Sequence, residues 1–409
     1  MKTQNSSKGY KKKAILFLAS QSITLFGSSL TQFALIWYVT MQTSSGIWLS
    51  AMTIAAYLPQ FLISFFSGVW ADRYSRKKLI ILSDSLIALS TLVVALLFPL
   101  IPQGTPVLLT LVAVSVVRSV GMGIQTPAVN ATIPRLVPED KLMKFNGFNS
   151  AMQSVVQFVS PLTAGAVLSL STLSVAMAID VATAIVGIGM LCAVAIPFEK
   201  QPNRPSALSE MKIGLRYAVK DGFVGKLLLV FGLFIFLCVP VGFMSTLFVK
   251  RSYGDEYWYM SLVELVGFVG MTAGGLIIGA WGGFKNRMKT LVTGMTAFGV
   301  LAVCMGAVDN FIAYLVFMAF YGVALTTVQT AMTTLFQEQS SLEMQGRVFG
   351  LFGAVYSGFL PLGMLVFGPL ADVVNMRILM ITSGALLLVA SVAIALDKRF
   401  FRHGIKIEQ

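Results

Sequence analysis

Long apolar stretches alternate with short polar loops along almost the whole chain of 409 residues. Each stretch holds about 20 residues, the length at which an α-helix crosses the hydrocarbon core of a bilayer. Spanning helices satisfy their backbone hydrogen bonds internally, as lipid requires. The pattern therefore predicts an all-α membrane protein with twelve spans, near residues 14–40, 47–71, 79–100, 106–128, 146–168, 174–196, 226–249, 257–281, 288–308, 311–332, 347–370 and 376–396.

The longest polar stretch, residues 197–225, divides these spans into two sets of six. Its first part is rich in proline and reads as a linker. In its second part apolar residues recur every three or four positions, which predicts an amphipathic helix on the inner membrane surface: Leu208, Met211, Leu215 and Ala218. The expected domains are an N-terminal six-helix bundle (1–196), a cytoplasmic linker (197–225) and a C-terminal six-helix bundle with a cytoplasmic tail (226–409).

The two sets of spans carry similar segments in the same order. Residues 68–76 resemble residues 279–287, which lie 211 positions later, and residues 129–136 resemble residues 328–335, which lie 199 positions later. Repeated halves with the same orientation are typical of transporters whose binding site lies between the halves. We therefore expect two parallel-related six-helix bundles.

The positive charges lie almost entirely on alternate loops. Of the 30 Lys and Arg residues, 26 belong to the two termini and to the loops on their side of the membrane, whereas only Lys250, Arg251 and Arg377 belong to the other loops. Because basic loops stay in the cytoplasm, this bias predicts that both termini are cytoplasmic. The net charge of +13 then reflects contact with anionic membrane lipids, and no nucleic-acid partner is needed to explain it.

Several kinds of chemistry have no support in the sequence. The three cysteines, Cys192, Cys238 and Cys304, lie in spans and read as packing residues, and the single histidine, His403, lies in the C-terminal tail. We therefore expect no metal site and no cofactor. No phosphate-binding loop of the form G-x-x-x-x-G-K-[ST] and no nucleophile–base pair is evident, which argues against ATP hydrolysis and against an enzyme.

The most specific motif is Gly68-x-x-x-Asp72-Arg73-x-Ser75-Arg76-Lys77, at the end of the second span. It resembles the G-x-x-x-D-R-x-G-R-[KR] loop of the major facilitator superfamily. Gly68 would let two helices approach closely, and Asp72 would face a cation or a helix N-terminus, so that a charged latch closes the inner gate. The alternative is that Arg73 and Arg76 only set the topology. Ser75 replaces a usual glycine, so we expect a tighter or strained turn.

The second half departs from this motif. It keeps Gly279 and Arg287 but has Gly283 where the acid would be, so its inner latch is expected to be weaker or absent. Span five carries Ser160-Pro161, in a degenerate form of the exporter signature of the same superfamily. The resemblance implies antiport and a gating role for these two residues, and the alternative is an ordinary proline kink.

Ionisable residues inside spans are expensive, so each is a candidate functional residue. Arg118 lies in span four, and two acids lie deep in the membrane, Asp180 in span six and Glu264 in span eight. Arg118 can neutralise only one of them. Since an unpaired carboxylate is costly in a low-dielectric medium, we expect at least one acid to be protonated for part of a transport cycle. Asp84, nearer the inner end of span three, is grouped with Arg73 and Arg76 as a gating residue.

The superfamily resemblance ranks these acids and implies a cavity. Its architecture makes Glu264 the better proton-coupling candidate, with Asp180 and Arg118 as alternatives or as a structural ion pair. The expected cavity wall is aromatic, methionine-rich and weakly polar, and suits bulky amphipathic molecules. Its candidate substrate-binding residues are Phe26, Gln32, Tyr57, Gln153, Gln157, Phe234, Phe236, Met244, Tyr321, Gln329 and Tyr356.

Within the superfamily the chain is similar to macrolide-efflux-type drug:proton antiporters along nearly its full length. The residues that carry this resemblance include Gln21, Ser22, Arg118, Thr126, Asn130, Asp180, Glu264, Glu338, Gly346 and Phe349. It implies export of hydrophobic drugs such as macrolides across the bacterial inner membrane, with a proton gradient as the energy source. We expect a monomer, since a self-contained unit of twelve spans can act alone. The alternatives are an exporter of a lipid or a siderophore-like amphiphile, a membrane enzyme, or a receptor that does not transport.

Overall fold

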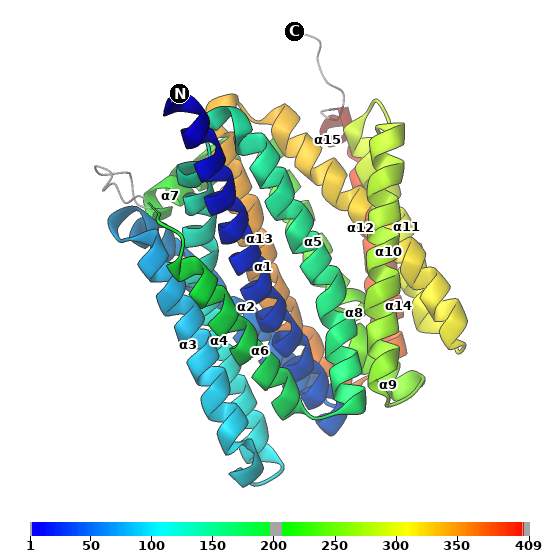
Figure 1. Cartoon of the computed structure of the whole chain (residues 1–409). Coiled ribbons are helices and arrows are strands. Elements are labelled where there is room, and N and C mark those ends of the chain that lie inside the picture. The colour runs from blue at the N-terminus through cyan, green and yellow to red at the C-terminus, as the bar shows by residue number, and fades with distance from the viewer. Residues whose placement is uncertain (1, 197–206, 403, 405–409) are drawn as a thin grey trace. The chain divides into compact units, whose positions relative to one another are not determined.

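The structure is a computed structural model, shown in Figure 1, which describes residues 2–196, 207–402 and 404. Over these residues the chain is helical and contains no strand. Twelve of the described helical segments are long and apolar enough to cross a membrane, which confirms the predicted fold class and number of spans. The protein is therefore a multi-pass membrane protein.

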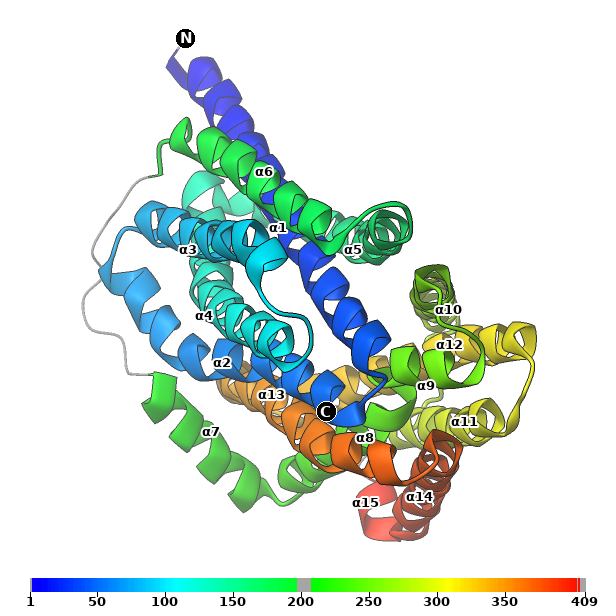
Figure 2. The ribbon, with the colours of Figure 1, turned by 90° about the horizontal axis from the view of Figure 1, so that it is seen from below.

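The chain divides into two compact units, of which unit 1 comprises residues 1–39 and 51–207. It contains most of the first six spans: α1 (Lys2–Thr43), α2 (Gly46–Arg73), α3 (Arg76–Leu97) with the short helix η1 (Phe98–Leu100), α4 (Thr105–Leu136), α5 (Glu139–Leu170) and α6 (Leu173–Cys192). Within this unit α3 lies between α4 and α6, as Figure 2 shows. Small residues allow the close contacts, since a Cβ on Gly121 of α4 would lie 3.3 Å from the Ser83 carbonyl of α3.

Unit 2 comprises residues 40–50 and 208–409. Its helices are α7 (Ala207–Asp221), α8 (Phe223–Gly242), α9 (Ser245–Ser252), α10 (Tyr257–Trp281), α11 (Arg287–Ala307), α12 (Phe311–Gln339), α13 (Leu342–Val373), α14 (Met376–Leu396) and α15 (Lys398–Arg402). Here α11 lies between α12 and α14, the same pairing that α3 makes in unit 1. The internal repeat in the sequence is thus matched by a repeat of helix neighbours.

Two local features differ from the expectations. The span predicted over residues 226–249 consists of two helices, α8 and α9, because the chain bends at Phe243 and Met244, shortly after Pro240 removes a backbone donor. The predicted linker helix exists as α7, but it also packs on α13, where Gly214 lies close to Arg347 and Leu351. Leu215 is exposed and Ala218 buried, whereas the side chains of Leu208 and Met211 lie outside the described residues.

The division into units also differs from the predicted domains. The connection between α1 and α2, residues 40–50, groups with unit 2 rather than with the rest of the N-terminal half. Backbone contact explains this, because a Cβ on Gly46 would lie 2.2 Å from the Gly368 carbonyl oxygen of α13. In addition, the Ser50 hydroxyl donates a hydrogen bond to the Met364 carbonyl at 2.7 Å.

A glycine seam joins α10 to α12 inside unit 2. A Cβ on Gly270 would lie 2.0 Å from the Ala319 carbonyl oxygen, and one on Gly322 would lie 2.5 Å from the Gly267 carbonyl oxygen. These are backbone atoms, which cannot rotate aside as a flexible side chain can. The absence of side chains at these glycines therefore sets the distance between the two helices.

This seam gives the first prediction. Gly270→Ala should lower the thermal unfolding temperature of the detergent-purified protein, since overpacking a closely packed contact costs about 1–3 kcal/mol. Gly279→Ala is the matched control on the same helix, where nothing lies within 4 Å of the added Cβ. Equal unfolding temperatures for the two variants would contradict the proposed role of the seam.

Candidate functional site

A buried ion pair joins α4 to α6 within unit 1. The Arg118 guanidinium donates to Asp180 Oδ2, and the two side chains are only 3% and 1% exposed. A lone charge at this depth would be expensive, whereas a paired one is largely compensated. Arg118 therefore neutralises Asp180, one of the two deep acids.

Further hydrogen bonds tie this ion pair to two more helices. The Ser28 hydroxyl of α1 donates to Asp180 Oδ1 at 3.2 Å, and the Thr91 hydroxyl of α3 lies 3.2 Å from Oδ2. Arg118 also donates to the Ser28 carbonyl at 2.9 Å and to the Thr91 hydroxyl oxygen. The pair thus links α1, α3, α4 and α6, an arrangement suited to fixing the core of unit 1.

Glu264 has a different environment, two turns into α10 of unit 2. It is partly buried, and no hydrogen bond or ion pair to it occurs among residues 2–196, 207–402 and 404. In α12 of the same unit, the fully buried Tyr314 hydroxyl has no hydrogen-bond partner in the described part of the chain. Unlike Asp180, Glu264 therefore has no balancing cation in the part of the chain that the structure describes.

Asp84 is buried in unit 1 against α4. Its Oδ1 accepts a hydrogen bond of 2.6 Å from the Gln125 amide, and its Oδ2 has no partner within the described ranges. The expected grouping of Asp84 with Arg73 and Arg76 is therefore wrong in its contacts. At helix position 84 the side chain lies two turns above the basic loop and faces α4, a direction that loop proximity alone could not reveal.

Gln125 forms part of a polar pocket of about 140 Å³ among α1, α4 and α5. The side chains that line this amide pocket are mostly neutral hydrogen-bonding groups: Gln21, Ser22, Leu25, Gln125, Thr126, Val129, Asn130, Asn149, Gln153 and Gln157. The Gln21 and Gln125 side chains are buried, and Gln21 Oε1 has no hydrogen-bond partner in the described chain. The pocket thus offers acceptor oxygens to a ligand that donates hydrogen bonds.

Sequence reasoning found only part of this pocket. It named Gln153 and Gln157 but missed Gln21, Gln125 and Asn149 as site residues. The signal was helical spacing, because Asn149, Gln153 and Gln157 recur every four residues and so share one face of α5.

Three of the predicted aromatic and methionine contacts are instead core residues of unit 2. Phe234 and Met244 have no exposed surface and Tyr321 is 6% exposed. The Phe298 ring packs against both Phe234 and Tyr321, with centroid separations of 5.0 and 4.7 Å. Large rings at buried helix positions fill space between helices, so their type alone did not indicate a cavity wall.

The other predicted substrate contacts are scattered, and none lines the amide pocket. Phe26 and Gln32 are partly buried in α1, and Tyr57 of α2 is 39% exposed. In unit 2, Phe236 packs on Phe367 with a centroid separation of 5.1 Å, whereas Gln329 is exposed and Tyr356 is partly buried. Their role in substrate contact stays a prediction.

The inner-loop motif of the first half is only partly visible. The surroundings of Gly68 and the side chain of Asp72 lie outside the described part of the chain, whereas Arg73 is exposed and Arg76 is buried. Ser75 has φ −60° and ψ 114°, an extended conformation that any residue adopts, so the expected strain at this position is absent. Lys77 donates to the Cys192 and Val194 carbonyls, at the end of α6.

In the second half, Gly283 stands where the motif of the first half has Asp72, and the conformation of the turn requires a glycine there. Gly282 and Gly283 both have φ +75°, a left-handed conformation that glycine adopts without steric cost. Arg287 pairs instead with Glu338 of α12, at 3.4 Å. The basic residue of the motif is thus held inside unit 2 by an acid from another helix.

The exporter signature lies in the middle of α5, which continues as one helix through Pro161. Ser160 has no exposed surface, and its hydroxyl lies 3.5 Å from the Phe26 carbonyl of α1. Ala164, one turn later, is also fully buried. Small residues here let α5 approach α1, while the gating role predicted for Ser160 and Pro161 stays a prediction.

Comparison with known proteins matches the chain to a family of transporters and to efflux proteins. The family model described as Major Facilitator Superfamily matches residues 17–364. The chain is 29% identical over 384 residues to Macrolide efflux protein A of Streptococcus pyogenes, covering 93% of this chain and 94% of that protein. It is 30% identical over 319 residues to Macrolide efflux protein A of Enterococcus faecalis, covering 77% and 98%. It is also 26% identical over 300 residues to Enterobactin exporter EntS of Shigella boydii serotype 18, covering 70% and 68%.

Solved structures of low sequence identity share the fold. A bacterial homolog of the human lysosomal transporter Spinster has a TM-score of 0.71 at 13% identity, covering 97% of both chains. The nucleoside transporter NupG has a TM-score of 0.71 at 15% identity, covering 96% of this chain and 99% of that one. At these identities the likeness concerns the fold alone.

The ion pair of unit 1 gives the second prediction. Arg118→Gln and Asp180→Asn should each destabilise the folded protein by about 3–5 kcal/mol, since each leaves an uncompensated buried charge. The double variant should lose much less than the sum of the two, because it removes both charges. Thermal unfolding of the four proteins in detergent measures this coupling, and additive losses would contradict the pairing.

Proposed function

Because this chain belongs to the major facilitator superfamily, we propose that it is a secondary active exporter of macrolides and similar amphipathic drugs, driven by proton antiport. It acts in the bacterial cell membrane with both termini in the cytoplasm, as the distribution of Lys and Arg favours. The energy source is the proton gradient, and the working unit is a monomer. Similarity to Macrolide efflux protein A over 93% of the chain supports the substrate class.

The contrast between the two deep acids is the observation that carries the proton coupling. Asp180 is balanced by Arg118, whereas Glu264 has no cation among the described residues. An unbalanced carboxylate in a low-dielectric environment is more stable when it binds a proton. Glu264 therefore takes up a proton from outside, and its charge state biases the carrier between inward-open and outward-open conformations by differential affinity.

The amide pocket supports an assignment for the polar part of the substrate. The Gln125 amide donates its N–H to Asp84, which leaves the Gln125 carbonyl oxygen free to accept a hydrogen bond from a ligand. Gln21 adds a second acceptor oxygen without a partner in the described chain. Hydroxyl or protonated amine groups of an amphipathic drug are suitable donors, and the apolar part of the drug is left to contact nearby hydrophobic side chains.

A second candidate function is export of a siderophore. The similarity to Enterobactin exporter EntS favours it, and so does the hydrogen-bonding character of the amide pocket. A transport screen that includes macrolides, enterobactin and lipid-like amphiphiles separates the two. Preferential transport of a siderophore would replace the drug assignment and leave the proton coupling untouched.

The third prediction concerns Glu264. In proteoliposomes, Glu264→Gln should abolish drug-dependent proton movement while leaving drug binding in place, because glutamine keeps the shape but cannot exchange a proton. Glu256→Gln, an exposed acid just before the same helix, is the matched control and should behave as wild type. Unchanged coupling in Glu264→Gln would remove this residue as the proton carrier, and unchanged coupling in Asp180→Asn as well would remove both acids.

The fourth prediction concerns the amide pocket. Gln21→Leu and Gln125→Leu should each weaken binding of a macrolide about tenfold, as expected when a ligand donor loses its buried acceptor. Gln103→Leu, which changes an exposed amide in the α3–α4 loop, is the control and should leave affinity unchanged. Equilibrium binding to the purified protein measures the effect. Wild-type affinity in both pocket variants would place the substrate elsewhere.

A further inference from the structure

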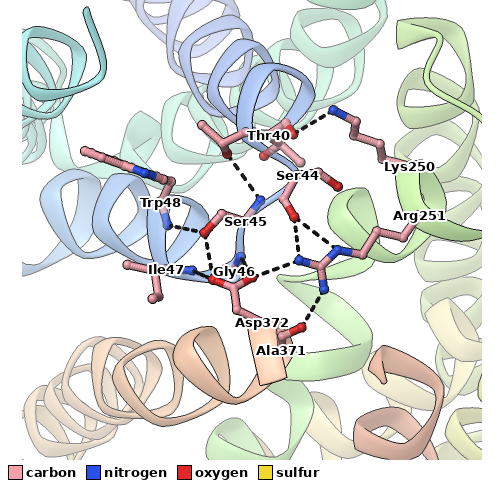
Figure 3. A network of polar contacts seen from close by, with 11 residues as sticks. Thr40, Ser44, Ser45, Gly46, Ile47, Trp48, Lys250, Arg251, Ala371 and Asp372 are labelled. Carbon is pink, nitrogen blue, oxygen red and sulfur yellow. Dashed lines mark hydrogen bonds and ion pairs between the residues drawn. The ribbon is translucent and has the colours of Figure 1, made fainter. Parts of the chain in front are cut away.

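The α1–α2 connection, Thr40–Ser50, belongs to unit 2 although most of α1 and α2 belongs to unit 1. Figure 3 shows the polar network that holds it, formed with Lys250 and Arg251 of α9 and with Asp372 of α13. By the predicted topology this connection lies on the outer side of the membrane. Contacts that hold a short connecting segment of this kind can control the movement of the two helices that it joins.

The Asp372 carboxylate of α13 caps the N-terminus of α2. Its Oδ1 accepts from the Gly46 amide at 2.6 Å, and its Oδ2 accepts from the Ile47 amide at 3.0 Å and from the Ser45 hydroxyl at 2.7 Å. The first amides of a helix have no partner within the helix, and the helix dipole makes this end positive. A carboxylate there is a charge-assisted cap, supplied here by α13, far away in the sequence.

The basic residues Lys250 and Arg251 lie at a C-terminal helix end, that of α1. The Lys250 ammonium donates to the Thr40 carbonyl at 3.3 Å and to the Met41 carbonyl. These carbonyls lie in the last turn of α1, where the helix dipole is negative. Unit 2 therefore places a cation at the negative C-terminal end of α1 and an anion at the positive N-terminal end of α2. Each charge is opposite in sign to the helix end that it meets.

Arg251 connects the two halves of this network. Its guanidinium donates to the Ser44 carbonyl, to the Ala371 carbonyl at 2.5 Å and to Asp372 Oδ1 at 2.8 Å. Ser44 has φ +49° and is the one non-glycine residue with positive φ in the described ranges. Such left-handed positions persist when neighbouring contacts hold them, and they cluster at switch regions.

The network also accounts for two exceptions to the charge bias. Lys250 and Arg251 are two of the three basic residues assigned to the outer loops, where positive charge is otherwise avoided. The third, Arg377, pairs with Asp309 at 2.7 Å and donates to the Gly306 and Val308 carbonyls, and it lines a surface pocket together with Arg251. In addition, Gly368-x-x-x-Asp372 repeats the spacing of Gly68-x-x-x-Asp72 at the opposite end of a span.

We propose that Asp372, Lys250 and Arg251 form an outer latch that holds the α1–α2 connection on unit 2 and releases it when the transporter opens outward. This proposal rests on the proposed function, since release is a step of a transport cycle. The latch is polar and partly exposed, so water can replace its hydrogen bonds at small cost. Below it, the backbone contact of Gly46 with Gly368 provides the close fit that a closed state needs.

A cysteine reporter tests the latch. Cys192, Cys238 and Cys304 are first replaced by serine or alanine in a chain that retains drug transport, and Ser50→Cys is then introduced. Ser50 is 4% exposed, so a membrane-impermeant maleimide added from outside should label it slowly while the latch is closed. Asp372→Ala should raise the labelling rate about tenfold, as expected for loss of charge-assisted hydrogen bonds. Asp372→Asn, which keeps one acceptor oxygen, should give a smaller rise.

Asp309→Asn is the matched control, because it breaks an Asp–Arg pair of unit 2 whose arginine donates to the Gly306 and Val308 carbonyls and, within the described chain, not to the α1–α2 connection. It should leave the labelling rate unchanged. Arg251→Gln provides a second latch variant in case Asp372→Ala fails to fold, and each protein is checked by size-exclusion chromatography. Wild-type labelling in folded latch variants, or an equal rise in Asp309→Asn, would overturn the proposal.

A second arm of the same experiment distinguishes failure of the proposed function from failure of the latch. The first arm uses neither drug nor proton gradient, so it reports on the latch alone. In the second arm, drug and gradient together should raise labelling of the reporter in the otherwise wild-type latch. If the variants behave as expected but this arm shows no rise and no drug is transported, the transport assignment fails and the latch contacts stand. If transport is normal and the variants label as wild type, the latch fails.

Discussion

The cost of a charge in a low-dielectric medium organises this protein. Within the spans, that cost is met in unit 1 by the Arg118–Asp180 pair, to which Ser28 and Thr91 add hydrogen bonds. Four helices are thereby fixed around one neutral centre. Glu264 of unit 2 has no such cation in the described chain, and the buried Asp84 of unit 1 is met only by the Gln125 amide. The Arg118–Asp180 pair thus contributes to structure, whereas a coupling role for Glu264 belongs to the proposed function.

Close helix contact is the second requirement, because lipid supplies little hydrophobic drive between helices. Glycines allow this close contact in both units. Gly121 does so between α4 and α3, and Gly270 and Gly322 do so between α10 and α12. Where glycines bring backbones together in this way, an added side chain would collide with a neighbouring helix, so the glycines set the distance between the helices. The ion pair and the amide pocket of unit 1 depend on such positioning, since their hydrogen bonds tolerate little displacement.

The sequence was sufficient for the spans and for the linker helix, because apolar length and helical periodicity are properties of single segments. It was insufficient where a contact joins distant segments. Asp84 meets Gln125 rather than the basic loop, and Phe234 fills the core rather than a cavity, since both outcomes depend on helix rotation. The strain expected at Ser75 is absent because another backbone conformation serves the same turn. The three pocket amides of α5, Asn149, Gln153 and Gln157, were detectable in principle through their four-residue spacing, whereas Gln21 of α1 and Gln125 of α4 were not.

The partial exposure of Asp372 and Arg251 has a consequence for the environment in which the protein works. Dissolved ions screen such charges, with a Debye length of about 8 Å at physiological ionic strength, whereas they scarcely reach the Arg118–Asp180 pair. Under the proposed latch, the salinity of the medium would therefore shift the equilibrium between the closed and the outward-open conformation and leave the interior of unit 1 unaffected. Such a transporter would then work at different rates in dilute and in salty surroundings, without any change in its fold.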